Sequence, residues 1–300
     1  MSSVVIIGAG YVGQRVVPLL QNEDVEVYVT TRQHKNDRGK SNNDAYVSKH
    51  FLDLDQSDSD IDLDWLPNSF SVLYSAPPST QDYPDHHDHR VRKFLHCLGD
   101  HLPSRIVYIS TTGVYGDANG EWVDETSNTN PNTDRGKRRL DAEQQLQAWC
   151  KQRDIPWVIL RVAAIYGPGR LGLEALKNRT GMIRADQAPP GNRIHADDLA
   201  HICLRALRSS ICSRVFNASD GNPIPRIEFC RLVALHAGLP EPVAKDFDEV
   251  WAGASPAQRS FLRGARKVSN QRLRNELGVT LRYSDVETGI IASLVPDKTP

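Results

Sequence analysis

Three glycines near the start of the chain have the spacing of a phosphate-binding turn. The stretch VVIIGAGYVGQRVVPLL places Gly8, Gly10 and Gly13 in a G-x-G-x-x-G pattern directly after an apolar run and at the opening of a helix. The first glycine allows a tight turn, the second lets the backbone approach a pyrophosphate, and the third lets helix and strand pack closely. N–H groups at the helix N-terminus attract the anion. The pattern predicts dinucleotide binding, with Tyr11 and Val12 in the same turn; a merely structural turn is the alternative.

The end of the next apolar run, VEVYVT, bears on which dinucleotide binds. An NAD site places Asp or Glu at the end of the second strand to take the ribose hydroxyls. Thr31 and Arg32 stand there instead, and the planar guanidinium of Arg32 can pair with a 2′-phosphate. We therefore expect NADP, with NAD as the second choice. A solvated surface arginine is the alternative reading of Arg32.

The elements that position these residues alternate along the chain. Short β-branched or aromatic runs are separated by helical patterns, which is typical of βα units and a parallel sheet covered on both faces. We predict an α/β fold, a Rossmann-type doubly wound parallel sheet with a smaller C-terminal substrate-binding lobe. The predicted strands are 4–8, 25–30, 71–76, 105–110, 157–166 and 214–219; clear helices are 90–99, 136–152 and 197–209. The stretch SNNDAYVSK, residues 41–49, indicates a surface loop with an edge element.

A change in composition after residue 167, at GPGRLG, indicates a second part of the chain. We predict an NAD(P)-binding Rossmann domain over residues 1–168, to which 195–218 returns. Residues 169–194 and 219–300 form the predicted substrate-binding lobe, because this part mixes Pro/Gly loops with short helices.

Overall composition limits the classes of function. The 300 residues, 39% of them hydrophobic, can bury a sizeable core. Lys plus Arg number 36 against 37 for Asp plus Glu, so no global field draws in a polyanion or a membrane surface. The five cysteines form no C-x-x-C pair, and no segment approaches the 18 or so apolar residues of a membrane span. We expect a cytoplasmic protein in a reducing compartment.

A longer stretch, YISTTGVYGDANGEWVDET, is more specific. It resembles the extended, epimerase/dehydratase-type branch of the short-chain dehydrogenase/reductase superfamily, in which a strand ends in Ser/Thr and continues as V-Y-G before an acidic loop. Further matching motifs follow in order through nearly the whole chain: GKRRLDAE, LRVAAIYGPGR, NRIHADDLA, VFNASDG and ARKVSNQRLRNELG.

This resemblance implies roles for residues that no simple pattern would single out. Thr111 matches the active-site Ser/Thr, whose hydroxyl binds the reacting carbonyl or alcohol. The implied cofactor contacts are Asp53 and Leu54 at the adenine, Ala76 and Pro77 where the fourth strand meets the cofactor, and Val162 and Ala163 beside the nicotinamide.

The residues usually most reactive in such enzymes are replaced here. Relatives carry Y-x-x-x-K followed by L-x-x-E, and aligning on LDAE puts Arg135 at the tyrosine and Arg139 at the lysine. A tyrosine with a free pKa near ~10 can exchange a proton with substrate. An arginine, with a pKa above ~12, is a permanent donor that binds an oxyanion without usefully giving up a proton. We predict Thr111, Arg135 and Arg139 as the catalytic set.

Another residue would then have to supply the proton. Lys137 is two residues from Arg135 and points about 200° around the helix from it. The titratable residues Tyr115, Tyr166 and His195 are further candidates, although structural roles explain them as well. Water or an unidentified acid completes the alternatives.

Two departures concern the substrate. Nucleotide-sugar enzymes of this branch have Asn where this chain has Ala164, and many have Arg where it has Gly191. We therefore expect a small polar, anionic substrate other than a nucleotide sugar, with Arg193 or Arg170 compensating. The predicted function is an NADP-dependent oxidoreductase or epimerase-like enzyme. A catalytically silent NADP-binding redox sensor is the alternative that loss of the Tyr/Lys pair keeps open.

Other partners are disfavoured. The basic cluster at residues 137–139 lacks interleaved aromatics, which argues against nucleic acid. The run DHHDH, residues 85–89, has no obvious further ligands, so we predict no metal. Relatives often pair through the helices that flank the active site, here 90–99 and 136–152, so a homodimer is an expected assembly.

Overall fold

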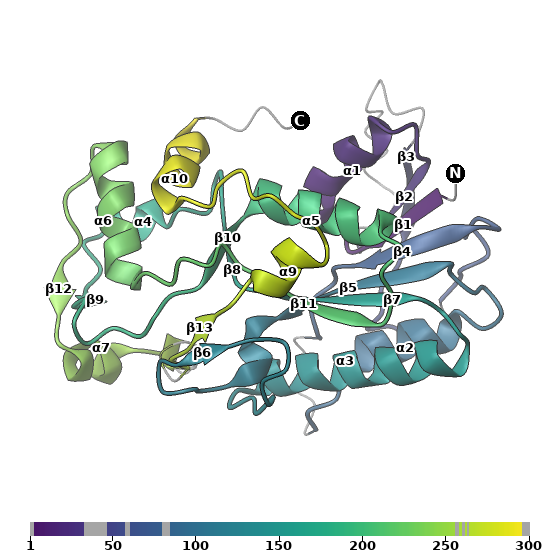
Figure 1. The fold of residues 1–300 in the computed structure, drawn as a ribbon, viewed down its shortest axis with the longest axis horizontal. Helices are drawn as coiled ribbons and strands as arrows, with labels where there is room; N and C mark the ends of the chain where they lie inside the picture. Colours follow the sequence, from purple (N-terminus) through teal and green to yellow (C-terminus); the bar gives the residue numbers. More distant parts are fainter. Residues whose placement is uncertain are drawn as a thin grey trace. The chain divides into compact units, whose positions relative to one another are not determined.

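A seven-stranded parallel sheet is the centre of the fold (Figure 1). Its strands lie in the order β11-β7-β5-β4-β1-β2-β3. The computed structural model describes residues 3–32, 47–57, 61–79, 85–255, 258–259, 262 and 264–295. The strands are β1 (Ser3–Ile7), β2 (Val27–Thr31), β3 (Val47–Phe51), β4 (Phe70–Tyr74), β5 (Arg105–Thr111), β7 (Trp157–Val162) and β11 (Arg214–Ala218). The predicted Rossmann-type sheet is confirmed, and β3 is the expected edge element.

The order of the strands reverses beside β1. From β1 the chain runs outward to β2 and β3, and then crosses to β4 on the other side of β1. In open α/β sheets, ligands bind outside the carboxyl ends of the strands at such a switch point. The glycine turn follows β1 directly, so it lies at this position.

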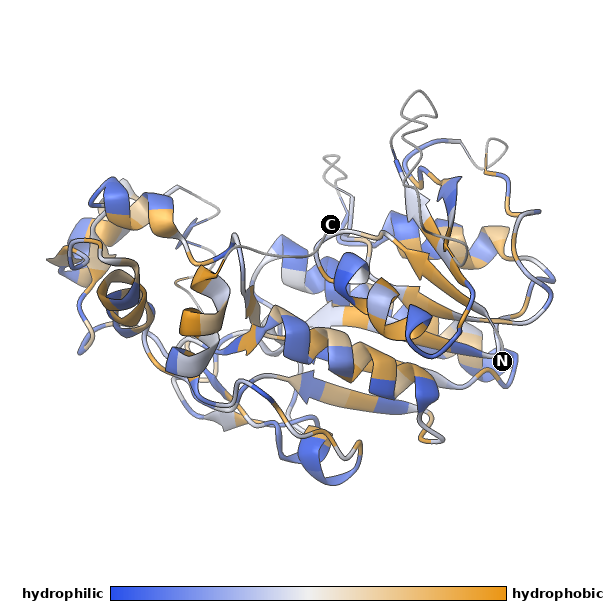
Figure 2. Cartoon of the chain, turned by 90° about the horizontal axis from the view of Figure 1, so that it is seen from above, coloured by the Kyte–Doolittle hydropathy of each residue, from blue (hydrophilic) through white to orange (hydrophobic). Residues whose placement is uncertain are grey.

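Four helices cover the two faces of the sheet. In Figure 1, α2 (His89–Cys97) and α3 (Asp134–Gln152) lie along one face, and α1 (Gly13–Gln21) and α5 (Ala196–Arg208) along the other. The core beneath α2 and α3 joins apolar residues of the strands, such as Val72 and Ile106, to helix residues such as Phe94 and Leu146. The central strands in Figure 2 are coloured mainly as hydrophobic, as burial on both faces requires.

The chain divides into two compact units. Unit 1 consists of Met1–Thr111, Lys137–Arg161 and Leu199–Phe216, and unit 2 of Thr112–Gly136, Val162–Asp198 and Asn217–Pro300. Segment 112–136, assigned to the Rossmann domain from the sequence, therefore clusters with the C-terminal residues. One reason is Asn217, which accepts a hydrogen bond from Tyr115 Oη at 2.7 Å and donates its N–H to Glu125 Oε1 at 2.7 Å.

Unit 2 contains three small parallel ladders and several short helices. Its strands pair as β6 (Trp122–Val123) with β13 (Lys267–Val268), β8 (Ala164–Tyr166) with β10 (Arg193–His195), and β9 (Met182–Ile183) with β12 (Ala244–Lys245). Its helical segments are η2 (Thr112–Tyr115), α4 (Leu173–Lys177), α6 (Arg226–Ala237), α7 (Phe247–Gly253), α9 (Gln271–Asn275) and α10 (Val286–Leu294). A separate core includes Tyr166, Ile227, Val233 and Ile290.

The predicted strand 157–166 is in fact two strands. Its first part, β7, belongs to the large sheet, whereas β8 pairs with β10. Between them, the Ala163 N–H donates to the Ala218 carbonyl at 3.0 Å. Both parts consist mainly of apolar residues, so hydropathy alone did not mark the break. None of the described helices has the length and apolar character needed to cross a bilayer.

Candidate functional site

The glycine turn brings the ends of β1, β2 and β4 together. Gly8 has a φ of 83°, a left-handed conformation that favours glycine. A Cβ on Gly8 would lie 2.9 Å from the backbone N and Cα of Ala76. The Gly8 N–H also donates to Thr30 Oγ1 at 2.9 Å. A side chain at residue 8 would therefore separate the turn from the end of β4.

The other two glycines have different surroundings. A Cβ on Gly13 would lie 3.1 Å from Ile6 Cγ2, so a side chain there would make this close contact between α1 and β1 too tight. A Cβ on Gly10 would have a single neighbour within 4 Å, the Gly8 carbonyl oxygen at 4.0 Å, and Gly10 is exposed. The backbone around Gly10 is thus left uncovered, as the close approach of a ligand requires.

The start of α1 provides donors at this uncovered backbone. Its N-cap residue, Val12, makes no side-chain capping bond. Within the described part of the chain, the N–H groups of Val12 and Gly13 have no hydrogen-bond acceptor. Unpaired N–H groups and the positive end of the helix dipole attract a diphosphate. These residues fit the phosphate portion of a dinucleotide.

Arg15 is a residue of this turn that sequence reasoning missed. Its guanidinium lies 3.9 Å from the centre of the Tyr11 ring, and its Nη1 donates to the Tyr11 carbonyl at 3.0 Å. Arg15 is buried. The spacing of four residues, which brings side chains to one side of a helical turn, was the available signal. Arg15 therefore fixes the ring of Tyr11 within the glycine turn.

Arg32 lies at the carboxyl end of the sheet, one residue after β2. Its side chain is 61% exposed, and Nη1 lies 3.8 Å from Asp55 Oδ2. Asp55 is bound mainly by the nearly buried Arg90, whose hydrogen bond lowers the pKa of this carboxyl group. Asp55 is thus held by Arg90 and contacts Arg32 only at long range. Most of the Arg32 side chain faces solvent.

The predicted adenine residues lie next to this acid. Asp53 Oδ1 accepts the Asp55 N–H at 3.0 Å, and Leu54 is buried in the unit 1 core. Arg90, which the sequence did not single out, also donates to the Pro77 carbonyl at 2.8 Å. The buried guanidinium of Arg90 thus joins the segment around Asp53 and Leu54 to Pro77, and both are predicted to contact the cofactor.

Thr111 is the last residue of β5 and is partly buried. The preceding Ser110 is buried and donates to Glu143 Oε1 at 2.5 Å, and Glu143 Oε2 accepts a bond from Arg161 at 2.8 Å. Adjacent side chains of a strand point to opposite faces. The burial of Ser110 against α3 therefore directs Thr111 to the other face.

Arg139 lies inside unit 1. It is 5% exposed, and its Nη1 donates to Tyr108 Oη at 2.8 Å and the Ile109 carbonyl at 2.9 Å, with the Ala76 carbonyl at 3.4 Å. The charge of Arg139 acts on buried Asp88, whose pKa is nevertheless raised because burial outweighs that attraction. Arg139 thus joins the ends of β4 and β5, and its contact with a cofactor stays a prediction.

Arg135 has a different environment from Arg139. It is exposed in the first turn of α3. A Cβ on the next residue, Gly136, would lie 2.9 Å from Pro131 Cβ and 3.0 Å from the Gly113 carbonyl. This close packing fixes the start of α3 against η2. Two residues on, Lys137 Nζ lies 3.2 Å from His86 Nε2.

The remaining predicted contacts are in unit 2. Val162 and Ala163 are both buried, at the junction between β7 and β8. Ala164, the position of the substrate-contacting Asn in nucleotide-sugar enzymes, is exposed. Of the two arginines proposed to compensate, Arg193 is buried and Arg170 is exposed.

The three candidate proton donors are tied into unit 2. Tyr115 Oη donates to Asn217. Tyr166 is buried against Gly289, and burial raises the pKa of its hydroxyl. His195 is 1% exposed; its Nδ1 accepts the Asp197 N–H at 3.2 Å, so its Nε2 carries the proton and donates to Ser293 Oγ at 3.1 Å. These contacts give each side chain a structural role.

Comparison with known proteins decides the family. The family model described as "NAD dependent epimerase/dehydratase family" matches residues 4–219. The chain belongs to this epimerase/dehydratase family. The matched segment contains the glycine turn, Arg32 and Thr111, as well as Arg135 and Arg139 of α3. The resemblance predicted from the sequence is therefore confirmed.

Individual known proteins are similar to this chain over almost its whole length. Protein YeeZ of Escherichia coli (strain K12) is 25% identical over 296 residues, covering 95% of this chain and 97% of that protein. A solved structure of a functionally unknown conserved protein from Silicibacter pomeroyi is 29% identical, with a TM-score of 0.78 and 98% of each chain covered. MoeE5, solved with UDP-glucose and NAD, has a TM-score of 0.76 at 19% identity over 97% of each chain, which shows the shared fold.

The described part of the chain contains no assembled metal-binding site. No group of three or more His, Cys, Asp or Glu side chains there could hold an ion. Two of the three histidines of DHHDH pair with carboxylates instead: His87 Nδ1 lies 2.8 Å from Asp141 Oδ1, and His89 Nε2 lies 2.9 Å from Asp85 Oδ1. Asp141 raises the pKa of His87 through that hydrogen bond.

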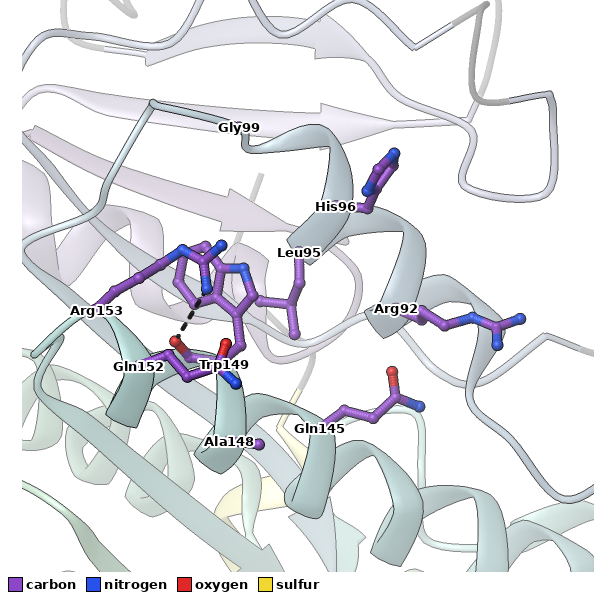
Figure 3. A pocket seen from close by; sticks show the side chains of 9 residues that line it. All are labelled: Arg92, Leu95, His96, Gly99, Gln145, Ala148, Trp149, Gln152 and Arg153. Atoms are coloured by element: carbon purple, nitrogen blue, oxygen red, sulfur yellow. Dashed lines mark hydrogen bonds between the residues drawn. The ribbon is translucent and has the colours of Figure 1, made fainter.

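A hollow of about 360 Å³ lies on the outer sides of α2 and α3 (Figure 3). Arg153 lies with its guanidinium 4.5 Å from the centre of the Trp149 ring, and Nη1 donates to the Trp149 carbonyl at 3.5 Å. The lining residues are Arg92, Leu95, His96, Gly99, Gln145, Ala148, Trp149, Gln152 and Arg153. None of them is a predicted cofactor or catalytic residue, so this hollow is not part of the predicted dinucleotide site.

Proposed function

We propose that the protein is an NADP-dependent oxidoreductase or epimerase/dehydratase-like enzyme that acts on a small polar, anionic substrate. Membership of an NAD dependent family supports nicotinamide chemistry in general. The choice of NADP rests on one observation: Arg32 follows β2 with its guanidinium 61% exposed, in place of a ribose-binding acid.

The chain's own residues would bind the cofactor in parts. The N–H groups of Val12 and Gly13 hold the diphosphate, and Arg32 takes the 2′-phosphate. Asp53 and Leu54 contact the adenine. The remaining proposed contacts are Gly8, Gly10, Tyr11, Ala76, Pro77, Val162 and Ala163. When bound, the nicotinamide ring exchanges a hydride with the substrate.

Thr111, Arg135 and Arg139 have separate proposed roles. The Thr111 hydroxyl donates a hydrogen bond to the reacting carbonyl or accepts one from the alcohol. Arg135, exposed and permanently charged, stabilises an oxyanion or carboxylate. Arg139 acts as a positioning residue, because its bonds to Tyr108 and Ile109 fix the end of β5 two residues before Thr111. The proton comes from water or from an acid not yet assigned.

The surroundings of Tyr115, Tyr166 and His195 favour a second function, that of a redox sensor. A redox sensor needs cofactor binding without turnover. Arginine cannot replace the catalytic tyrosine as an acid. Tyr115 and His195 are hydrogen-bonded inside unit 2, and Tyr166 is buried there with a raised hydroxyl pKa. A sensor would report the cofactor's redox state to a partner protein.

Turnover distinguishes the two functions. Purified protein is assayed for NADPH consumption with a panel of small aldehydes and keto acids, alongside Thr111→Ala and Arg135→Ala. The enzyme hypothesis predicts consumption that either substitution lowers by at least about tenfold, the loss typical of one transition-state hydrogen bond. Arg179→Ala, at an exposed position of unit 2, is the control. Tight NADPH binding with no consumption would instead support the sensor.

The cofactor preference has its own test. Arg32→Ala is expected to weaken NADPH binding by about 10- to 100-fold, the worth of charge-assisted hydrogen bonds to a phosphate, and to leave NADH binding unchanged. Calorimetric titration with both cofactors measures this. Equal losses for NADPH and NADH would show that Arg32 does not read the 2′-phosphate.

We also propose a homodimer that pairs through the outer sides of α2 and α3, as the family resemblance implies. The hollow in Figure 3 supports this assembly, because the half-buried Trp149 and the edge of the buried Leu95 line it beside polar side chains. Apolar and aromatic residues with a polar surround are typical of protein interfaces.

A further inference from the structure

Arg193 is a buried cation in unit 2 that forms no ion pair with the described residues. It is the first residue of β10 and only 7% exposed. Its Nη1 donates to the carbonyl oxygens of Gly191 at 2.7 Å and Ile224 at 2.8 Å, and its guanidinium lies 4.5 Å from the centre of the Phe229 ring. Within the described parts of the chain, it has no carboxylate at ion-pairing distance. A charge removed from water in this way is costly unless a counter-charge meets it.

Gly191 makes room for this guanidinium. A Cβ on residue 191 would lie 2.7 Å from the Ile224 carbonyl oxygen and 2.8 and 2.9 Å from Nη2 and Nη1 of Arg193. The guanidinium therefore fills the volume that a side chain at 191 would take. Any larger residue at 191 would displace Arg193 from both carbonyls, so the glycine is required for this arrangement.

Asp220 does not neutralise Arg193. Its charge is the strongest electrostatic influence on Arg193, yet its Oδ1 accepts the Asn222 N–H at 2.9 Å and its Oδ2 is buried without a partner. Burial raises the pKa of Asp220 to about 7, so near neutral pH a large fraction of this carboxyl group is uncharged. Burial also lowers the pKa of Arg193, to about 10, so Arg193 stays protonated at neutral pH.

The other donors of Arg193 remain available. Nη2 and Nε bond to no oxygen of the described residues, and neither is among the unpartnered polar atoms that are sealed from solvent. One nitrogen is thus anchored to two carbonyls while the adjacent N–H groups form a planar fork. Such a fork matches the two oxygens of a carboxylate or phosphate.

We propose that Arg193 binds an oxyanion of the substrate, a carboxylate or a phosphate, through Nε and Nη2. This rests on the proposed function in that the anion belongs to the substrate, although anion binding is measurable without turnover. The two carbonyls and Phe229 hold the guanidinium in place before the anion arrives, which lowers the entropic cost of binding. A purely structural arginine, which ties residue 191 to residue 224, is the competing explanation.

The test measures anion binding to the full chain. Inorganic phosphate and acetate are titrated by calorimetry at constant ionic strength, with the dinucleotide site blocked by saturating NADPH. Arg193→Met removes the charge at similar length, and Gly191→Ala keeps the charge but displaces it. Arg184→Met is the matched control, because Arg184 is an exposed arginine of the same unit that pairs with Asp186 at 2.7 Å. NADPH titration of each variant tests the cofactor site separately.

The proposal predicts that wild type and Arg184→Met bind one of the two probes, and that Arg193→Met and Gly191→Ala weaken it by at least about tenfold. Tighter phosphate than acetate binding would indicate a phosphorylated substrate, and the reverse a carboxylic acid. Should Arg193→Met fold poorly, Gly191→Ala and Arg193→Lys, which keeps charge without the fork, carry the same expectation. Equal binding to all folded variants, or none to wild type, overturns the proposal. If wild type binds phosphate or acetate but does not bind NADPH, that result contradicts the proposed function and not the role of Arg193.

Discussion

Replacing two neighbouring glycines by alanine should separate cofactor binding from stability. Gly10→Ala adds a methyl group where the nearest heavy atom is 4.0 Å away, at a residue outside the left-handed region. Gly8→Ala adds the same group at a φ of 83°, 2.9 Å from the Ala76 backbone. The chemical change is identical, and only the surroundings differ.

The structure sets the expected magnitudes. For Gly10→Ala the free energy of unfolding should change by no more than about 0.5 kcal/mol, as for substitutions that meet no neighbour. NADPH affinity should fall by about 10- to 100-fold, because the methyl group holds the diphosphate away from N–H donors worth about 1.5–3 kcal/mol each. Gly8→Ala should cost roughly 2–4 kcal/mol of stability, from the left-handed backbone and the overlap with Ala76.

Two measurements check this pair. Urea denaturation gives the free energy of unfolding, and fluorescence titration gives NADPH affinity. Gly253→Ala, a glycine with no neighbour within 4 Å, serves as the control for the substitution itself. If Gly10→Ala binds NADPH as tightly as wild type, the uncovered backbone at Gly10 does not hold the diphosphate. If Gly10→Ala is as unstable as Gly8→Ala, the argument from local packing is wrong.

Three further predictions concern other parts of the chain. Arg139→Met should lower the free energy of unfolding by about 2–4 kcal/mol in denaturation experiments, because it leaves the buried oxygens of Tyr108 and Ile109 without their donor. The NADPH affinity of the folded variant should change less than about threefold. Unchanged stability with a tenfold loss of affinity would show that Arg139 contacts the cofactor. The pKa of Asp220 is raised on folding, so its stabilising contribution is complete below about pH 4 and is lost as pH rises to about 7, by about 1.4 kcal/mol per pH unit at most. Asp220→Asn should lack that slope, so the difference in unfolding free energy between wild type and variant should fall as pH rises from about 4 to about 7, and a difference that does not change with pH would contradict the assigned pKa. Ala148→Arg, at an exposed position of the hollow in Figure 3, should convert a dimer into a monomer in sedimentation analysis, whereas a monomeric wild type would refute pairing through α2 and α3.

Much of the cofactor-binding half could be predicted from the sequence, because its signals are local. The glycine spacing, the alternation of strands and helices and the residue after β2 each depend on a few neighbouring positions. The order of the motifs along the chain predicted the epimerase/dehydratase family, and the family match over residues 4–219 confirms it. The division of 157–166 into two strands was missed, since both are mainly apolar and the break depends on Ala218, far along the chain.

The roles of the arginines depended on contacts that no local pattern contains. The sequence placed Arg135 and Arg139 on one side of a helix, but only the fold showed that Arg139 is buried against Tyr108 and Ile109 while Arg135 is exposed. Likewise, the fit of Arg193 into the space beside Gly191 requires the carbonyl of Ile224, 31 residues away. Spacing in the sequence determines which side chains can share a face; burial and hydrogen-bond partners are set by residues distant in sequence, so tertiary structure alone decides them.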